Sequence, residues 1–409
     1  MTLTPPDRSA APYWRLSAWY FCYFAFVGAF SPYFGLYLQG LGHSAWDISV
    51  LLSLMQVMRL LAPNLWGWLA DRCGGKTIIL HATAACSLLA FGGFWLTTGF
   101  AGLFLIMALL AFFWSATLPL VEALTLGHLQ QQAERYGSIR LWGSVGFVAA
   151  VTGSGALLDA FPLSSLLGLS MALLAGILAC GLTLPEAQQA SVAASHATLG
   201  DTLRQPQVLT LLAACFLMSA AHGPLYVFYS IHLVEHGYDK TLVGELWALG
   251  VVAEILVFML MPRLLRRYSL RNILLASFIC AVVRFLLTGW YVDALGVMLL
   301  AQVLHGATFG AYHAAAMAAL HHWFPDRQQA RAQALYGSVS FGAGGMLGGL
   351  LSGLAWGSYG AGWTYSMAAL FALCGLLLVW RSMAKTIHSE YDGGTKIISA
   401  SNSPPAEPS

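Results

Sequence analysis

Long apolar segments separated by short polar breaks run through nearly the whole 409-residue chain. Because about 20 apolar residues cross a bilayer as a helix, this pattern predicts twelve membrane-spanning helices. Charged residues make up only 9% of the chain, against about 25% in an ordinary soluble domain, which argues against a soluble fold. The predicted spans are residues 16–40, 46–69, 77–97, 100–125, 139–160, 163–183, 207–234, 241–262, 272–291, 294–320, 332–356 and 361–381.

No pattern in the sequence indicates catalysis, a cofactor or a bound metal. The 7 cysteines are scattered singly, without the spacing of a zinc site or a disulfide framework. The run Gly74-Gly75-Lys76-Thr77 is similar to the end of a phosphate-binding loop, but Ala70 replaces the required first glycine. The basic residues form no patch that would bind nucleic acid. We therefore expect a non-enzymatic monomer whose partners are the bilayer, a small-molecule substrate and protons.

The basic residues are distributed unequally between the two sides of the predicted membrane. If the N-terminus is inside, Lys240 is the only Lys or Arg in an outer loop. The positive-inside rule then places both termini in the cytoplasm. We expect five segments: a cytoplasmic N-terminal segment (1–15), a six-helix bundle (16–184), a cytoplasmic linker (185–206), a second six-helix bundle (207–384) and a disordered cytoplasmic tail (385–409).

The two predicted bundles repeat each other. The shift that places Arg72 on Arg267 also superposes Arg59 on Glu254, so the halves carry opposite charges at matched depth. Parallel six-helix repeats with a binding site at the midplane are a transporter architecture.

Charged residues inside the predicted spans are the strongest functional signal. Each costs about 2.5–3.5 kcal/mol at the bilayer centre, so such residues usually serve a substrate or ion pathway. Three arginines against two glutamates would leave a positive cavity that favours an anion. Alternatively, Arg59 satisfies backbone carbonyls, or Glu254 forms a static ion pair with Arg140 or Arg59. The five residues are Arg59, Glu122, Arg140, Glu254 and Arg284.

Several uncharged or titratable side chains are candidates for the same pathway. Apolar neighbours disfavour the charged form of a carboxyl group, which makes Glu254 the leading candidate proton carrier. His305 and His313 lie on one predicted helix, and could form a proton relay or merely pack. Tyr312 beside them and Phe147, seven residues after Arg140, are candidate substrate contacts.

The loop after the second predicted span carries a recognisable motif. The run from Gly67 to Lys76 (GWLADRCGGK) resembles the loop signature of the major facilitator superfamily, although Gly75 replaces a usual basic residue. The resemblance implies twelve helices in two bundles with alternating access. It also implies a gating role for Gly67, Asp71, Arg72 and Lys76.

Within that superfamily, Glu122 followed by Arg140 in YGSIRLWGS resembles the lactose-permease-like proton symporters. The resemblance implies that the two residues form a substrate-binding charge pair. The first 385 residues resemble more closely the bacterial phenylpropionate permease branch, through RLWGSV at Arg140, LWALGVVAE at Glu254 and QVLHG at His305. Lactose permease has a proton-carrying glutamate three residues after its histidine. Here Thr308 follows His305 and Ala316 follows His313, so Glu254 or a histidine must carry the proton.

We therefore predict an all-α membrane protein of twelve helices in the bacterial inner membrane. The predicted function is proton-coupled import of a small organic solute, best fitted by an aromatic carboxylate such as phenylpropionate. A neutral sugar or nucleoside symporter is the first alternative, in which each arginine is paired internally. A non-transporting membrane sensor on the same fold is the second.

Overall fold

The computed structural model describes residues 12–383 except 131, 188–199 and 325–327. The described part contains helices and no strand. The predicted tail 385–409 and most of the predicted linker lie outside the described residues.

Six long helices form the first bundle and confirm the first six predicted spans. A short 3-10 turn, η1 (Gly93–Trp95), extends α3, and a second, η2 (Ala133–Arg135), precedes α5. The helices are α1 (Tyr13–Gly40), α2 (Ala45–Cys73), α3 (Lys76–Gly92), α4 (Phe100–Leu129), α5 (Tyr136–Ala160) and α6 (Ser165–Leu182).

The second bundle also follows the predicted spans, but several of its helices are interrupted. Span 207–234 is broken at His222, just before Pro224 in the first turn of α9. Two other spans contain a π-helical segment, a feature that is common at functional sites. The elements are α7 (Gly200–Leu203), α8 (Pro206–Ala221), α9 (Gly223–Glu235), α10 (Lys240–Arg267), α11 (Leu270–Trp290), α12 (Leu295–His305), η3 (Gly306–Ala311), α13 (Tyr312–Trp323), α14 (Gln329–Gly337), η5 (Ser338–Gly344) and α15 (Gly345–Ser382).

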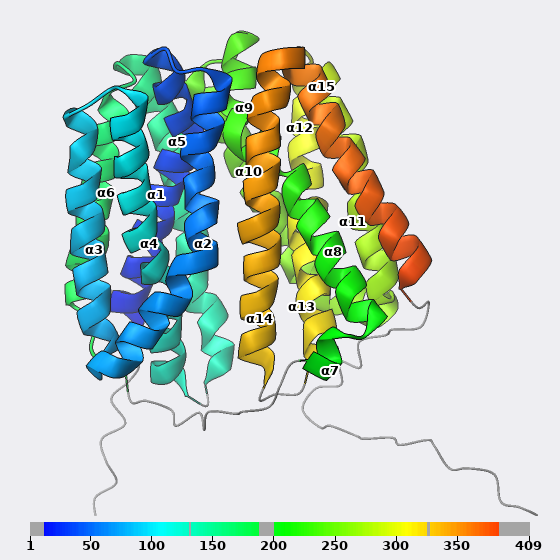
Figure 1. Cartoon of the computed structure of the whole chain (residues 1–409), viewed down its shortest axis with the longest axis horizontal. Coiled ribbons are helices and arrows are strands. Elements are labelled where there is room, and N and C mark those ends of the chain that lie inside the picture. The colour runs from blue at the N-terminus through cyan, green and yellow to red at the C-terminus, as the bar shows by residue number, and fades with distance from the viewer. Residues whose placement is uncertain (1–11, 131, 188–199, 325–327, 384–409) are drawn as a thin grey trace, which may run out of the picture.

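The predicted span 332–356 begins in α14 and continues through η5 into α15, which runs on without a break into the last predicted span, 361–381. At 1.5 Å per residue, 38 helical residues would extend about 57 Å, well beyond a hydrocarbon core of about 30 Å. Gly360 resolves this excess, because its φ of 78° is a left-handed conformation that reverses the chain. Figure 1 shows the chain rising to this point and descending again. The described chain therefore has 11 apolar helical segments long enough to span a membrane, and the last of them, Arg331–Ser382, contains the reversal at Gly360.

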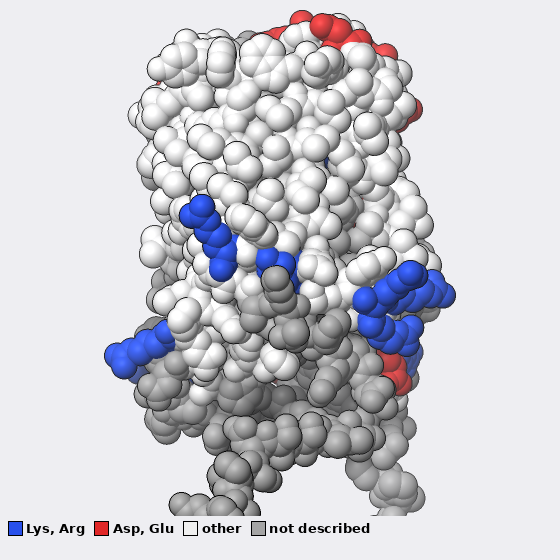
Figure 2. Space-filling view, turned by 90° about the vertical axis from the view of Figure 1, so that its right-hand side faces the viewer, with Lys and Arg blue, Asp and Glu red and all other residues white. Residues whose placement is uncertain are grey.

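The two bundles stand side by side (Figure 1), with α1–α6 on one side and α8–α15 on the other. We name the two ends after residues found there: the Lys76 end, where α1 begins and α15 ends, and the Lys240 end, where α10 begins. Figure 2 shows basic side chains toward the Lys76 end of one face and acidic ones mainly at the Lys240 end. This distribution agrees with the predicted orientation, in which the Lys76 end is cytoplasmic.

The bundles are joined at the Lys240 end. Asp159 of α5 accepts hydrogen bonds from the backbone N–H groups of Lys240 (3.0 Å) and Thr241 (2.8 Å), and from the Thr241 hydroxyl (2.7 Å). Tyr33 of α1 donates to the Lys240 carbonyl at 3.0 Å. Gln39 donates to Glu235 at 2.8 Å. These hydrogen bonds between described residues close the molecule at the Lys240 end.

A close helix crossing accompanies these bonds. A Cβ atom at Gly244 of α10 would lie 2.5 Å from both the Tyr33 hydroxyl and the Val151 carbonyl. Only glycine permits this approach, because any side chain would separate α10 from α5. The closure therefore depends on backbone contact as well as on the Asp159 cap.

A second carboxylate caps a helix at the Lys76 end. Glu186, which follows α6, accepts hydrogen bonds from the backbone N–H groups of Lys76 (3.1 Å) and Thr77 (2.9 Å), and from the Thr77 hydroxyl (2.7 Å). Partial burial alone would raise the pKa of Glu186, but the bonds from Thr77 and Lys76 outweigh burial and hold that pKa below its ordinary value. This cap joins α6 to α3 within one bundle.

Candidate substrate-binding site

A cavity of about 340 Å³ lies between the two bundles. Its walls come from α1, α2 and α5 on one side, and from α8–α10, α12, η3, η5 and α15 on the other. The volume and the largely apolar walls are typical of a small-molecule site. The sequence repeat predicts a site between the two bundles, and this cavity lies between them.

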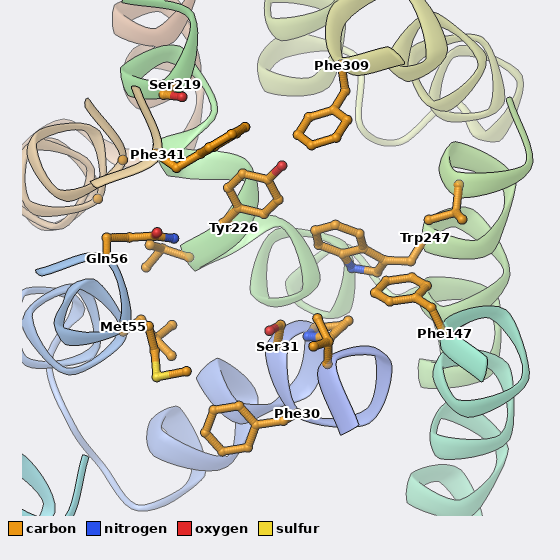
Figure 3. Close-up of a pocket in the computed structure, with 18 of the residues that line it drawn as sticks. Phe30, Ser31, Met55, Gln56, Phe147, Ser219, Tyr226, Trp247, Phe309 and Phe341 are labelled. Carbon is orange, nitrogen blue, oxygen red and sulfur yellow. The ribbon is translucent and has the colours of Figure 1, made fainter. Parts of the chain in front are cut away.

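Aromatic rings dominate the cavity wall. Figure 3 shows Phe147, Tyr226 and Trp247 turned toward its centre, with Phe309 and Phe341 further along the wall. Tyr226 and Trp247 lie nearly parallel, with ring centres 6.3 Å apart. Phe309 comes from η3 and Phe341 from η5, so each π-helical segment supplies one ring. Such a wall can stack against a planar apolar group.

Three charged residues predicted from the sequence line the cavity. Arg59 and Arg140 face it from the first bundle, and Glu254 faces it from the second. None of the three forms an ion pair with another of them in the described structure. The static pairing of Glu254 with an arginine is therefore not formed. With both arginines charged, the wall carries a net positive charge whether or not Glu254 is protonated.

Arg140 is positioned by aromatic rings rather than by a carboxylate. Its guanidinium carbon lies 3.8 Å from the centre of the Phe24 ring and 5.8 Å from that of Tyr20. Cation–π contacts of this kind hold a guanidinium but do not neutralise it. Glu122, the partner expected from the family resemblance, instead accepts a hydrogen bond of 3.4 Å from Tyr136. Glu122 is absent from the residues that line the cavity.

Glu254 lies near one of the two predicted histidines. Its Oε2 is 4.0 Å from Nε2 of His305, which also lines the cavity. Phe309 stacks on His305 and on His313, with ring centres 5.5 and 6.2 Å away. His313 instead interacts through Nδ1 with the Tyr336 hydroxyl at 2.9 Å. The described structure therefore places His305, but not His313, beside the candidate proton carrier.

Arg284 lies behind the cavity wall and is fully buried. It donates to the Ala301 carbonyl at 2.9 Å and to the Thr308 hydroxyl at 3.1 Å, and it lies 3.4 Å from His222 Nε2. His222 is not among the residues predicted from the sequence. A histidine next to a Gly-Pro pair inside an apolar span was the available signal.

The other predicted substrate contact from the second bundle is also removed from the cavity. Tyr312 is buried, and its hydroxyl donates to the Cys215 carbonyl at 3.3 Å. It therefore packs α13 against α8, outside the cavity wall. A direct contact of Tyr312 or Arg284 with substrate stays a prediction that this conformation does not display.

The predicted gating motif forms the turn between α2 and α3. Gly74 ends α2 with a φ of 69°, and Arg72 lies over the Trp68 ring at 4.2 Å. The Asp71 side chain lies outside the described part of the structure. The carboxylate observed at the α3 N-terminus is Glu186, which the sequence analysis did not identify. No group of three or more His, Cys, Asp or Glu side chains in the described residues could hold a metal.

Comparison with known sequences gives a consistent result. Residues 13–367 match the MFS_1 like family. The chain is 32% identical to the probable 3-phenylpropionic acid transporter of Escherichia coli (strain K12), over 88% of this chain and 95% of that protein. It is 27% identical to the maltose permease of Geobacillus stearothermophilus, over 88% of this chain and 92% of that protein.

Solved structures of transporters share the fold. The nucleoside transporter NupG superposes with a TM-score of 0.76 at 18% identity, over 90% of this chain and 97% of that one. A bacterial homolog of the human lysosomal transporter Spinster, inward-facing and unoccupied, superposes with a TM-score of 0.67 at 14% identity, over 93% and 96% of the two chains. At these identities the likeness establishes the architecture alone.

Proposed function

The chain belongs to the MFS_1 like family and is a multi-pass membrane transporter of small solutes, and on this premise we propose that it imports an aromatic carboxylate together with a proton. The proposed binding residues are Arg140 and Arg59 for the carboxylate and Phe147 for the ring. Glu122, Arg284 and Tyr312 would act from behind the wall. The Lys76 end is the proposed cytoplasmic end.

The guanidinium of Arg140, which forms no ion pair with a carboxylate of the described residues, carries the substrate assignment. Its aromatic neighbours hold it in the cavity without supplying a negative charge. A substrate carboxylate would supply that charge through two parallel hydrogen bonds, a geometry that guanidinium groups favour. The attached ring would then lie among the aromatic side chains that face the cavity centre. The name of the Escherichia coli relative is consistent with such a substrate.

Glu254 is the proposed proton carrier, with His305 as its partner. A carboxyl group in an apolar wall can accept a proton from one side of the membrane and lose it on the other. The imidazole of His305, 4.0 Å away, could exchange that proton after a small movement. His313 would join such a path only in a conformation in which Phe309 no longer stacks between the two histidines.

Binding can be tested with a pair of ligands that differ mainly in charge. We expect 3-phenylpropionate, but not its neutral amide, to raise the Tm of the purified protein. Arg140→Ala should remove this response, whereas Arg381→Ala, an exposed arginine at the end of α15, should retain it. Equal responses to the acid and the amide would contradict a carboxylate site at Arg140.

Transport can be tested in proteoliposomes. A pH gradient, acidic outside, should drive accumulation of labelled 3-phenylpropionate in the wild type. Glu254→Gln should lose this accumulation but keep substrate exchange, because the neutral amide resembles a permanently protonated carboxyl group. Gradient-driven accumulation by Glu254→Gln would exclude Glu254 as the carrier. Absence of flux for every solute tested would favour the sensor.

A nucleoside or sugar is the alternative substrate. Gln56, Ser31 and Ser219 line the cavity and could hydrogen bond to hydroxyl groups. The same thermal and uptake measurements with uridine and maltose distinguish this case. A response to uridine or maltose without a response to the acid would replace the aromatic carboxylate.

A further inference from the structure

A buried polar cluster in the second bundle has a positive charge without a counter-charge. Arg284 is fully buried on α11, and its three contacts are a carbonyl oxygen, a hydroxyl and a ring nitrogen. No Asp or Glu in the described residues pairs with it. Burial of an isolated charge is costly, so buried charges are normally paired or bind an ion.

His222 cannot supply the missing negative charge. Its Nδ1 lies 2.8 Å from the Met218 carbonyl, which can only accept a hydrogen bond. Nδ1 must therefore carry a hydrogen, and Nε2 can accept one from Arg284. The ring is thus a neutral acceptor for one Arg284 N–H group. Nη2 of Arg284 is left without any partner.

Further unpartnered polar atoms belong to residues beside Arg284. Gln302 and His305 lie on α12, the helix whose Ala301 carbonyl accepts a hydrogen bond from Arg284. Both residues are buried, and Nε2 of Gln302 and Nδ1 of His305 have no partner. The hydroxyl of Tyr229 is also buried, beside the Gln302 side chain and within electrostatic range of Arg284. All of these groups can donate a hydrogen bond.

The orientation of the His305 ring supports their convergence. A Cβ atom at Gly250 of α10 would lie 3.3 Å from Cδ2 of His305, so that edge of the ring faces α10. Nε2 is directed toward Glu254, which is also on α10. Nδ1 is on the opposite edge of an imidazole from Cδ2. It therefore points away from α10, and the ring lies within electrostatic range of Arg284.

We propose that Arg284, Gln302, His305 and Tyr229 form a binding site for a small monovalent inorganic anion such as chloride. Chloride has no directional lone pairs and can accept several N–H and O–H bonds at once, whereas water would leave the charge of Arg284 uncompensated. Arg284, Gln302 and Tyr229 do not line the cavity of the proposed carboxylate site, and His305 is the one residue that the cavity wall and the proposed anion site share. The anion site does not depend on the identity of the transported solute.

The anion would also set the state of His305. When the anion accepts a hydrogen bond from Nδ1 of His305, Nδ1 carries the hydrogen. Nε2 then keeps a lone pair, which is directed at Glu254. A bound anion would therefore prepare His305 to accept a proton from Glu254. This consequence rests on the proposed proton coupling, whereas the anion site itself does not.

Thermal unfolding in two salts tests the site. The purified wild type is compared in sodium chloride and sodium gluconate at equal ionic strength, without organic substrate. We expect chloride to raise the Tm saturably by about 2–4 °C relative to gluconate. Equal Tm values over the whole chloride range would overturn the proposal and leave a merely hydrated cluster.

A matched pair of variants at Thr308 locates the effect. Its hydroxyl lies 3.1 Å from Nη1 of Arg284, so Thr308→Asp would place a permanent carboxylate beside the guanidinium. We expect Thr308→Asp to lose the chloride response, and Thr308→Val, similar in shape and uncharged, to retain it. A full chloride response in a folded Thr308→Asp protein would overturn the proposal.

A second variant separates the two proposed anion sites and keeps the test valid if Thr308→Asp does not fold. Arg140→Ala should keep the chloride response while losing the response to 3-phenylpropionate. Loss of the chloride response in Arg140→Ala would place chloride in the central cavity and overturn the site at Arg284. This result is independent of whether 3-phenylpropionate is the transported solute.

Discussion

Two helices of this protein begin with the same Lys-Thr pair and carry the same kind of cap. At the start of α3, Glu186 accepts hydrogen bonds from both backbone N–H groups and from the threonine hydroxyl. At the start of α10, Asp159 accepts the same three hydrogen bonds. Corresponding distances in the two caps differ by no more than 0.1 Å. The chemistry is equal: a carboxylate satisfies the free N–H groups and the positive end of the helix dipole.

The caps differ in what they join. Glu186 directly follows α6, which is in the same bundle as α3, so the cap and α3 move together during any rocking of one bundle against the other. Asp159 belongs to the first bundle and α10 to the second, so this cap must break when the Lys240 end opens. The same local chemistry can therefore stabilise a fold in one place and a conformation in another.

The largest effect should follow Asp159→Asn. The amide keeps the shape but weakens hydrogen bonds that a charged acceptor makes strong, at a cost of about 1–2 kcal/mol. That energy changes a two-state ratio roughly 5- to 30-fold. We expect the population with an open Lys240 end to increase. Distances between spin labels on the α1–α2 and α9–α10 loops measure this population.

Glu186→Gln is the matched control for that measurement. It removes the same type of charge from a cap inside one bundle and should leave the spin-label distances unchanged. An equal shift of the distances in both variants would show that the Asp159 cap has no special role between the bundles.

Glu186→Gln should lower stability rather than alter conformation. A lost cap costs about 1 kcal/mol, seen as a lower Tm. The folded-state pKa of Glu186 lies below its ordinary value. Its contribution is therefore complete above the ordinary Glu pKa of about 4.3 and is lost as the pH falls through the folded-state pKa. The Tm difference between wild type and variant should shrink on acidification.

The two threonines give a finer version of the same comparison. Thr241→Val and Thr77→Val each remove one hydroxyl donor at 2.7 Å from a carboxylate and preserve the side-chain shape. We expect Thr241→Val to alter the rate of substrate exchange by a few-fold and Thr77→Val to alter only the Tm. Similar transport rates in the two variants would limit the role of the hydroxyl to stability.

The smallest effect should follow Lys240→Met. The Lys240 ammonium lies 3.3 Å from Asp159, but both side chains are partly exposed, and such surface pairs contribute about 0–1 kcal/mol. The backbone N–H group that contacts Asp159 remains in the variant. We expect transport within two-fold of wild type, with little dependence on salt. An increase in the open population as large as that in Asp159→Asn would assign the closure to the ion pair.

The spans were predictable because membrane helices must be long and apolar. The reversal at Gly360 and the α2–α3 turn at Gly74 also agree with glycine positions in the sequence. The internal repeat pairs Arg59 with Glu254, and both residues line the cavity. Each of these features is set by the residues of a single helix or turn, or by the pseudo-symmetry between the two halves of the chain.

The partners of the charged residues were not predictable in the same way. Instead of the expected Glu122–Arg140 ion pair, Arg140 forms a cation–π contact with Phe24, and Glu122 accepts a hydrogen bond from Tyr136. The expected relay between His305 and His313 is interrupted by Phe309. His222 was missed although it contacts Arg284. Spacing along one helix gives the face on which a residue lies, but not what another helix presents to it.

The sequence by itself determined that this chain crosses a membrane as two related bundles and that it keeps charges within them. The length of apolar segments, the unequal distribution of charge and the repeated motifs can be read directly from the order of residues along the chain. Only the tertiary structure decided which charges share the cavity, which one is isolated behind it, and which of two identical caps joins the bundles. Those outcomes depend on helix rotation and approach, where a shift of a few ångströms changes the partner of a side chain.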